Sequence, residues 1–332
     1  MYGRGPSAHN GLVHELVMGL PSVIPELIRY VDGLWIHSPG EVCMARLIAR
    51  LVAAQDGWAR PFGDFNHRWL TALFGPIRPI KDFLNGTWLG HPVHAMLTDL
   101  PIGALLLTVV LDVLGRNAAA DIALVATILF MLGAALAGFA DYTDTDGTAR
   151  TRATTHATLM VITLLLLLIS VALRAAAGSD RTIAVVVSFV AFLLLTAGAY
   201  IGGDVVYVLG NMVDRHAFRG AGTKWVRLDT GTLVDLMTLP ESTPTKAKAG
   251  INDLVLVRMG DTVHALHAVC AHAGGPLAEG TVVDGCIECP WHASRFRLTD
   301  GHLREGPTVY DQPVYELRPA DGGGYEVRRA AR

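Results

Sequence analysis

Four long apolar segments constrain the fold of this 332-residue chain more strongly than any other feature of its sequence. They run over residues 95–114, 122–140, 156–173 and 182–202. Each is close to the roughly 20 residues that a helix needs to cross the hydrocarbon core of a bilayer. Because lipid cannot satisfy backbone hydrogen bonds, we predict four transmembrane helices.

Short polar links join these segments in pairs, over residues 115–121 and 174–181. Short links favour antiparallel neighbours and therefore an up-down bundle with both chain ends on one side of the membrane. That side carries Arg78, Lys81, Arg150, Arg152, Arg215 and Arg219, and the other side carries Arg116, Arg174 and Arg181. The excess of Arg and Lys on the side of the chain ends predicts that these ends are cytoplasmic. The N-terminal stretch shows no secretory signal, which agrees with a multi-pass protein of the cell membrane in this orientation.

We assign the bundle to residues 91–215. The sequence predicts one further region before the bundle and one after it. Residues 1–90 hold an apolar stripe at helical spacing (Phe65, Trp69, Leu70 and Leu73), which predicts amphipathic helices that lie on the membrane surface or pack against the rest of the protein. The net charge is −3, and no basic stripe with interleaved aromatic residues indicates nucleic-acid binding.

Residues 225–330 have the texture of a small all-β domain. Strand-like runs occupy residues 254–258, 263–268 and 294–298. Gly260-Asp261 and Asp300-Gly301 follow two of these runs, and both dipeptides are hairpin signals. The predicted fold class is thus an α-helical membrane bundle followed by an all-β domain.

Two cysteine–histidine pairs lie within this β domain. Cys270 is followed by His272, and Cys289 by His292, with sixteen residues between the pairs. Thiolates and imidazoles at such spacing indicate metal binding rather than a disulfide framework. Structural zinc is the competing interpretation, but zinc sites usually pair Cys with Cys and His with His.

The surrounding sequence resembles the Rieske ferredoxin family over residues 225–328. The matching residues are Gly274–Leu277, Gly285, Cys289–His292, Ser294 and Phe296, followed by Asp300-Gly301, Gly306-Pro307, Pro313 and Tyr315. The resemblance implies a [2Fe–2S] cluster in which Cys270 and Cys289 bind one iron, and His272 and His292 bind the other.

Two positions depart from the Rieske subunits of quinol-oxidising complexes, which carry an additional disulfide between the cluster loops. Gly275 and Trp291 stand at the corresponding places, so the resemblance implies the ferredoxin and oxygenase-associated branch, with its lower potential. We expect Trp291, Pro276 and Leu277 to shield the cluster from water. Cys286 is expected to be a buried strand residue.

Histidines form a second candidate site at the membrane. His91 and His94 stand where the first apolar segment begins, and His156 opens the third, which the up-down topology places on the same side. Ionisable residues in such positions are functional candidates. Three interpretations stay open: axial ligands of a b-type haem, a quinone or proton site, or interfacial residues that cap helix ends and pair with nearby aspartates. His216 is expected to be a surface residue, and Asp112 to lie at the opposite interface.

Residues 75–215 resemble a bacterial family of predicted four-helix membrane proteins without an assigned activity. The matching residues are Gly90–Pro92, His94, Pro101–Gly103, Asp112, Gly138, Asp141, His156 and Tyr200–Gly203. This resemblance supports the topology and implies no chemistry.

Together these features predict a membrane-anchored electron-transfer protein rather than a stand-alone catalyst, because the chain has no nucleophile triad, phosphate loop or dinucleotide fingerprint. The expected partners are membrane lipid and a redox protein or quinone, whether in a homo-oligomer or a respiratory complex. Two alternatives remain: a ferredoxin-like component of a separate oxygenase or reductase with the helices only as an anchor, or an accessory or sensor subunit of a respiratory complex.

Overall fold

The computed structural model describes residues 50–176, 180–217, 224–231 and 235–330. The chain separates into two units, Met1–Gln55 and Asp56–Arg332. In the first unit, residues 50–55 are described and residues 50–53 are helical. The earlier part of the predicted 1–90 region lies outside the described residues.

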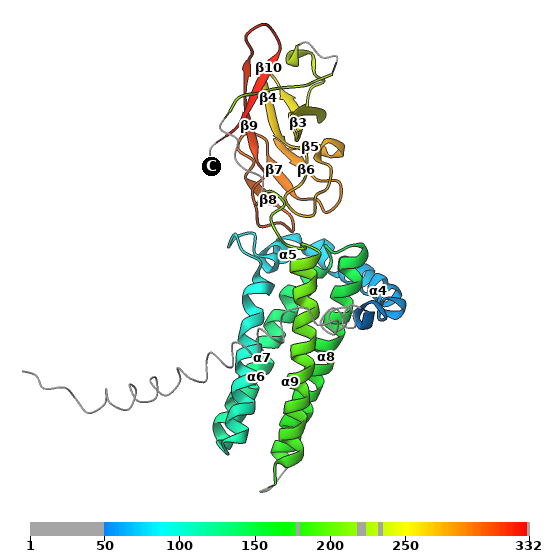
Figure 1. Cartoon of the computed structure of the whole chain (residues 1–332), viewed down its shortest axis with the longest axis vertical. Coiled ribbons are helices and arrows are strands. Elements are labelled where there is room, and N and C mark those ends of the chain that lie inside the picture. Colours follow the sequence, from blue (N-terminus) through cyan, green and yellow to red (C-terminus); the bar gives the residue numbers. More distant parts are fainter. Residues whose placement is uncertain (1–49, 177–179, 218–223, 232–234, 331–332) are drawn as a thin grey trace, which may run out of the picture. The chain divides into compact units, whose positions relative to one another are not determined.

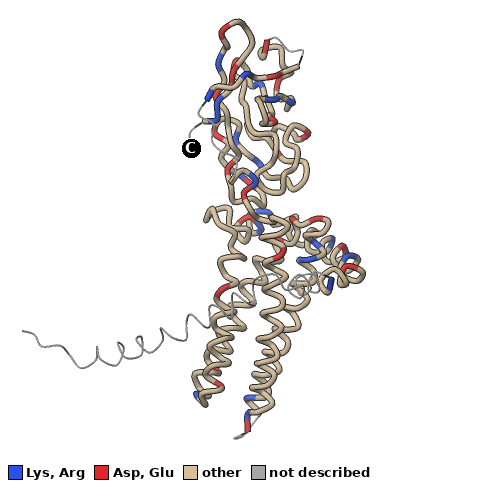
Figure 2. Tube along the Cα trace, viewed as in Figure 1, with Lys and Arg blue, Asp and Glu red and all other residues tan. Residues whose placement is uncertain are grey.

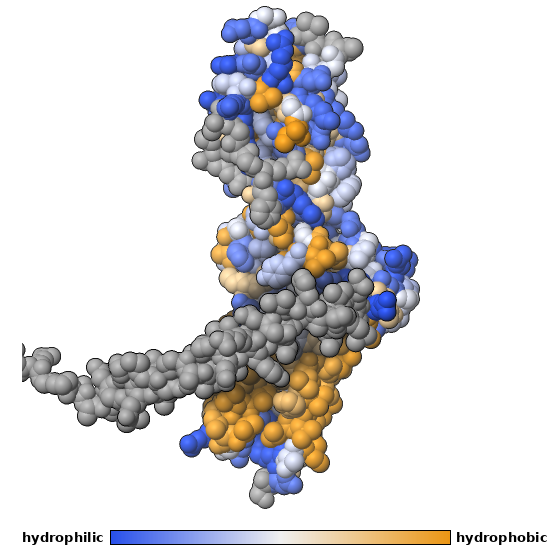
Figure 3. Space-filling view, viewed as in Figure 1, coloured by the Kyte–Doolittle hydropathy of each residue, from blue (hydrophilic) through white to orange (hydrophobic). Residues whose placement is uncertain are grey.

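The prediction of four membrane-length helices is confirmed. They are α6 (Val93–Val113), α7 (Asn117–Tyr142), α8 (Gly147–Ala176) and α9 (Thr182–Gly203), which lie side by side in one bundle (Figure 1). Within the described residues, all four are long and apolar enough to cross a membrane. Charged residues are sparse along their length (Figure 2), and the visible face of the bundle is predominantly apolar (Figure 3).

Leucines fill the interior of the bundle and also cover its outside. Leu105, Leu124, Leu167 and Leu195 are buried at the centre, one from each helix. Other large apolar side chains point outward, as Leu129 does with 61% of its surface exposed. A helix that is apolar on all sides suits a lipid environment, where the outer face needs no polar residues.

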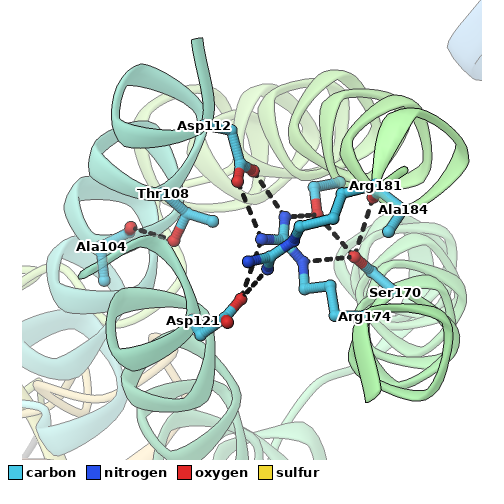
Figure 4. A network of polar contacts seen from close by, with 9 residues as sticks. Ala104, Thr108, Asp112, Asp121, Ser170, Arg174, Arg181 and Ala184 are labelled. Carbon is cyan, nitrogen blue, oxygen red and sulfur yellow. Dashed lines mark hydrogen bonds and ion pairs between the residues drawn. The ribbon is translucent and has the colours of Figure 1, made fainter. Parts of the chain in front are cut away.

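A buried ionic network closes the end of the bundle at which α6 meets α7 and α8 leads to α9 (Figure 4). The Arg174 guanidinium donates to Asp112 at 2.8 Å and to Asp121 at 3.1 Å. Arg181 also pairs with Asp121. The side chains of Arg174 and Asp112 are 4% and 0% exposed, so both charges face the interior of the protein. Asp112 lies near the far end of α6, as expected, and Arg174 lies in the last turn of α8 at the same end of the bundle.

Two further helices, α4 (Asp56–Phe74) and α5 (Arg78–Asn85), lie at the other end of the bundle, joined by a 3-10 turn at Gly75–Ile77 (Figure 1). The Tyr142 hydroxyl donates to the carbonyl of Gly63 at 3.1 Å and lies 2.6 Å from the Thr154 hydroxyl. A Cβ on Gly63 would approach Thr154 Oγ1 to 2.5 Å, so glycine allows this contact. The apolar residues predicted to form one stripe on α4 differ in burial, since Leu70 is buried against the protein and Trp69 is 60% exposed.

The C-terminal residues form two antiparallel sheets. The six-stranded sheet has the order β1 (Val226–Arg227), β10 (Tyr325–Arg329), β9 (Val314–Pro319), β4 (Thr262–His267), β3 (Asn252–Met259) and β2 (Thr245–Ala249). The four-stranded sheet has the order β5 (Thr281–Val283), β6 (Cys286–Glu288), β7 (Arg295–Arg297) and β8 (Leu303–Glu305).

The all-β prediction is confirmed, and its hairpin signals lie where the chain turns. Gly260, at φ 59°, stands between β3 and β4, and Gly301, at φ 72°, stands between β7 and β8. Strand β3 is buried on both faces: Val255 and Val257 face the core shared with the second sheet, and Leu254 and Leu256 face another core. This arrangement holds the loops that follow β4 and β6 on one framework.

Candidate metal centre

The first cysteine–histidine pair lies on a tight loop that follows β4. The Cys270 amide donates to the Gly275 carbonyl at 2.9 Å, and the Gly274 amide donates back to the Cys270 carbonyl at 3.0 Å. Gly274 has a φ of 87°, which favours glycine over residues with a Cβ. These bonds fix the backbone around Cys270 and present His272 within the loop.

The second pair lies on a loop of the same design after β6. The Cys289 amide donates to the Ser294 carbonyl at 2.9 Å, and the Ala293 amide donates to the Cys289 carbonyl at 3.1 Å. Ala293 occupies the left-handed region with a φ of 57°. Such a conformation costs about 1 kcal/mol or more in a residue other than glycine and is concentrated at functional sites.

The two loops bring like side chains together. Cys270 and Cys289 lie in one buried cluster, and each thiol shifts the pKa of the other. The ring centroids of His272 and His292 are 4.9 Å apart. A Cβ on Gly275 would approach the Cys289 sulfur to 2.7 Å, so glycine lets the loops meet. The predicted set of four ligands is thus assembled as a thiol pair and an imidazole pair.

Several atoms of this site are buried without a hydrogen-bond partner among the described residues: both ring nitrogens of His272, Nδ1 of His292 and Oγ of Ser294. Buried polar atoms normally have partners, and orphaned ones call for an explanation such as a bound ion. No three metal-binding side chains of the described residues converge on a single ion position. Two sulfurs and two imidazole nitrogens in separate pairs fit a two-iron cluster.

Electrostatics keep the imidazoles neutral. Burial, with a smaller effect from the neighbouring His292, lowers the pKa of His272 to about 3. Burial also lowers the pKa of His292. The hydrogen bond from Cys270 lowers the pKa of Cys289 to about 7, and the same bond, with burial, raises the pKa of Cys270. Neutral imidazole and thiolate are the forms that bind metals.

Comparison with known proteins assigns the domain that carries these loops to a family. Residues 232–316 match the family model described as Rieske [2Fe-2S] domain. The chain is 35% identical over 82 residues to the anthranilate 1,2-dioxygenase ferredoxin subunit of Burkholderia cepacia, a match that covers 25% of this chain and 76% of the relative. The chain belongs to the Rieske [2Fe–2S] family.

Other proteins are also similar to parts of this chain. Ferredoxin CarAc of Metapseudomonas resinovorans is 31% identical over 78 residues, which cover 24% of this chain and 73% of that relative. The solved ferredoxin of carbazole 1,9a-dioxygenase from Nocardioides aromaticivorans IC177 is 30% identical and covers 33% of this chain and 99% of its own, with a TM-score of 0.27. Residues 90–215 match the family described as Predicted membrane protein (DUF2231). Both predicted resemblances are therefore confirmed.

Gln312 supports the first loop of the Rieske domain and is absent from the sequence prediction. Its Oε1 accepts from the Ala271 amide at 2.9 Å, and its Nε2 donates to the carbonyls of His267 and Val269 at 2.7 and 2.8 Å. The side chain is buried and fills three hydrogen-bonding positions of a loop about 40 residues away in sequence. No local pattern marks such a residue.

His216 also contacts this loop, so its assignment as a surface residue is wrong. It is 3% exposed, its Nε2 donates to the Val269 carbonyl at 2.9 Å, and its ring centroid lies 4.5 Å from that of His267. The expected shield is also incomplete, because Leu277 is buried but Trp291 is 52% exposed. Cys286 is buried in β6, as expected.

We expect Gln312→Leu to lower the amount of cluster that the Rieske domain retains. The change removes the Gln312 partner of the Ala271 amide and of the His267 carbonyl, at about 1–3 kcal/mol for each buried group left unsatisfied, and leaves the Val269 carbonyl with the bond from His216 alone. Iron and acid-labile sulfide per chain, measured after purification, report the loss. Equal cluster content in Gln312→Leu and the parent protein would contradict the assigned role.

Outside the Rieske domain, the membrane histidines separate into a pair and a lone residue. His94 in α6 and His156 in α8 have ring centroids 6.2 Å apart. His91 is exposed, and its Nδ1 lies 3.2 Å from the Pro92 carbonyl. The structure thus brings together two of the three candidate residues.

An acidic cluster lies where α7 ends. Asp144 accepts from Lys81 Nζ at 2.6 Å and from Asn85 Nδ2 at 3.2 Å, and its side chain is 4% exposed. Asp141 is also buried, and its Oδ1 has no hydrogen-bond partner among the described residues. The bonds from Lys81 and Asn85 tie α5 to the end of α7.

Burial raises the pKa of Asp144 from 3.8 to about 6, against the opposing effect of Lys81. Between these values the folded protein binds more protons than the unfolded chain, so we expect stability to fall as pH rises from about 4 to about 6, by up to about 3 kcal/mol. Melting temperatures in detergent across this range should show a smaller slope for Asp144→Asn. Asp64→Asn, at a side chain 52% exposed, is the control; an unchanged slope in Asp144→Asn would contradict the prediction.

Proposed function

We propose that this protein is a membrane-anchored Rieske electron carrier that passes single electrons between a donor in the membrane, quinone or haem, and a partner protein. The observation that carries the proposal is the paired arrangement of Cys270 with Cys289 and His272 with His292, on a chain with four membrane-length helices. When bound, a [2Fe–2S] cluster supplies a one-electron couple.

The residues of the site have separate roles in this proposal. Cys270 and Cys289 would hold one iron and His272 and His292 the other. Two neutral imidazoles in place of two thiolates leave less negative charge on the reduced centre, which raises its potential above that of an all-cysteine cluster. Leu277 excludes water from one side of the site, because it is fully buried in the core beside both cysteines.

The comparisons favour a second candidate for the partner. Anthranilate 1,2-dioxygenase ferredoxin subunit and ferredoxin CarAc are both ferredoxins, and the first belongs to a dioxygenase. By extension, the Rieske domain would serve a separate oxygenase or reductase, with the four helices as its anchor. A role as an accessory or sensor subunit of a respiratory complex would instead require stable association with the subunits of that complex.

We place the Rieske domain in the cytoplasm. The four membrane-length helices of the described residues begin and end on one side of the bundle, and the excess of Arg and Lys flanking the helices on that side follows the bias of cytoplasmic loops. A green fluorescent protein fused to the C-terminus should fluoresce, and an alkaline phosphatase fused there should be inactive. The reverse pair of results would place the domain on the outer side.

The central test is low-temperature EPR of washed membranes that contain the full chain, reduced with dithionite. A Rieske signal that stays with the membrane after an alkaline wash supports the proposal. Metal analysis of the purified protein provides the opposing outcome: zinc without iron or acid-labile sulfide would overturn it. Turnover of the oxidised cluster by a quinol, or co-purification with an oxygenase component, then distinguishes the two partners.

A further inference from the structure

His94 is held in one orientation by its own helical hairpin. Its Nδ1 lies 2.8 Å from the Ala134 carbonyl in α7, and a carbonyl can only accept, so Nδ1 carries the proton. A Cβ on Gly138, one turn further along α7, would lie 2.9 Å from both Nδ1 and Cε1 of this ring. The Nδ1–Cε1 edge of the ring therefore packs against Gly138, where no Cβ is in the way. Nε2 keeps a lone pair that is not used in this contact.

The second hairpin repeats this arrangement. The Nδ1 of His156 in α8 lies 2.8 Å from the Gly198 carbonyl in α9. A Cβ on Gly202, again four residues after the carbonyl, would lie 2.9 Å from Nδ1 of the ring. Each hairpin thus contributes one imidazole of the same tautomer, and no hydrogen bond to Nε2 of either ring occurs among the described residues.

The fixed tautomer is the one that metal-binding histidines use. Such residues donate their second ring N–H to a backbone carbonyl or carboxylate, which orients the ring and makes the free nitrogen more basic. Two such imidazoles, from facing hairpins of a bundle, form the kind of site at which helical bundles hold cofactors.

The separation of the rings indicates which kind of metal centre fits. With a metal–nitrogen bond of about 2.0–2.1 Å, the centre of an imidazole lies about 3.2 Å from the metal. Two rings on opposite sides of one metal are then about 6.4 Å apart, and two rings at a tetrahedral angle about 5.2 Å apart. The centroids of His94 and His156 are 6.2 Å apart with their planes at 79°, and this distance is close to that of two rings on opposite sides of one metal. Opposed axial imidazoles leave the four equatorial positions of the metal to another ligand, which a porphyrin supplies.

We propose that His94 and His156 are the two axial ligands of a haem in the membrane bundle. The haem is of the non-covalent b type, because the sequence contains no Cys-x-x-Cys-His attachment motif. This inference rests on the proposed function in one respect, since it names the membrane donor or acceptor of the cluster. Ferrous haem becomes ferric when it releases one electron, and the oxidised cluster takes up that electron as one of its two ferric ions becomes ferrous.

The test uses the full chain, purified in mild detergent from cells supplied with a haem precursor. Optical spectra with and without dithionite, and the pyridine haemochrome assay, measure haem per chain. We expect a low-spin spectrum in the parent protein and its loss in His94→Ala and His156→Ala. His91→Ala is the matched control, because this histidine is exposed and three residues from His94, and it should keep the full haem content.

A glycine variant separates ligation from folding. His94→Gly leaves a space the size of the imidazole, so added imidazole should restore the low-spin spectrum when haemin is supplied. EPR of the cluster on the same samples reports the Rieske domain independently. A normal Rieske signal without haem, even after titration with haemin, would overturn the haem site and leave the proposed carrier function standing. Haem that survives both alanine changes, or a quinone or bare metal ion bound in its place, would also overturn it.

Discussion

His272→Ala and His292→Ala should each abolish the Rieske EPR signal of the reduced protein while the membrane helices stay folded. Each change would remove one of the two neutral imidazoles that we propose as ligands of the second iron. The helices belong to a part of the chain with its own leucine core. Low-temperature EPR measures the first effect, and the helical circular dichroism signal in detergent measures the second.

Cys286→Ser provides the control for this experiment. Cys286 is buried in β6 and lies three residues before Cys289, but outside both cluster loops. Its substitution should therefore leave the signal intact. Burial raises the pKa of the Cys286 thiol. A normal signal in either histidine variant, or its loss in Cys286→Ser with the domain folded, would refute the ligand assignment.

Arg174→Leu should destabilise the bundle by about 3–5 kcal/mol, the usual effect of removing one partner of a buried ion pair. The Asp112 side chain is 0% exposed, and its carboxylate accepts hydrogen bonds from the two terminal nitrogens of the Arg174 guanidinium. Without Arg174 its carboxylate would stay buried and unpaired, or would have to take up a proton. Thermal unfolding in detergent, followed by loss of helical signal, measures the change.

The same substitution at Arg116, which is exposed at the same end of the bundle, should have little effect. Combining Arg174→Leu with Asp112→Leu removes both charges, and we expect much of the lost stability to return because no unpaired charge remains. Equal stability of Arg174→Leu and Arg116→Leu would show that the network in Figure 4 contributes nothing measurable.

The sequence predicts the parts of this protein that short stretches of chain determine. The helices follow from the length of the apolar segments, and the cluster loops from residues that lie within a few positions of each ligand. The sequence does not indicate Gln312, because its partners lie 41 to 45 residues away and meet it only after β9 pairs with β4.

Charges and histidines show the same division. Arg174 stands beside a polar link in the sequence, but its partner Asp112 is 62 residues away, so only the packed bundle shows that the pair is buried. His216 follows a long hydrophobic segment, and the sequence predicts a surface residue there. Its burial is not visible in the sequence because its partner Val269 is 53 residues away. The pairing of His94 with His156 likewise needs the helices to be packed against each other, because each ring is oriented by a different hairpin.

The way each hairpin orients its own histidine has a thermodynamic consequence. The hydrogen bonds of His94 and His156 close within α6–α7 and α8–α9 and do not cross from one hairpin to the other. The loss of rotational freedom of both rings therefore accompanies the folding of the hairpins and not the arrival of a ligand. A small change in the spacing of the two hairpins would alter the distance between the rings without disturbing either ring's hydrogen bond. Each hairpin thus fixes the orientation of its own imidazole, and the packing of the two hairpins sets the distance between the imidazoles.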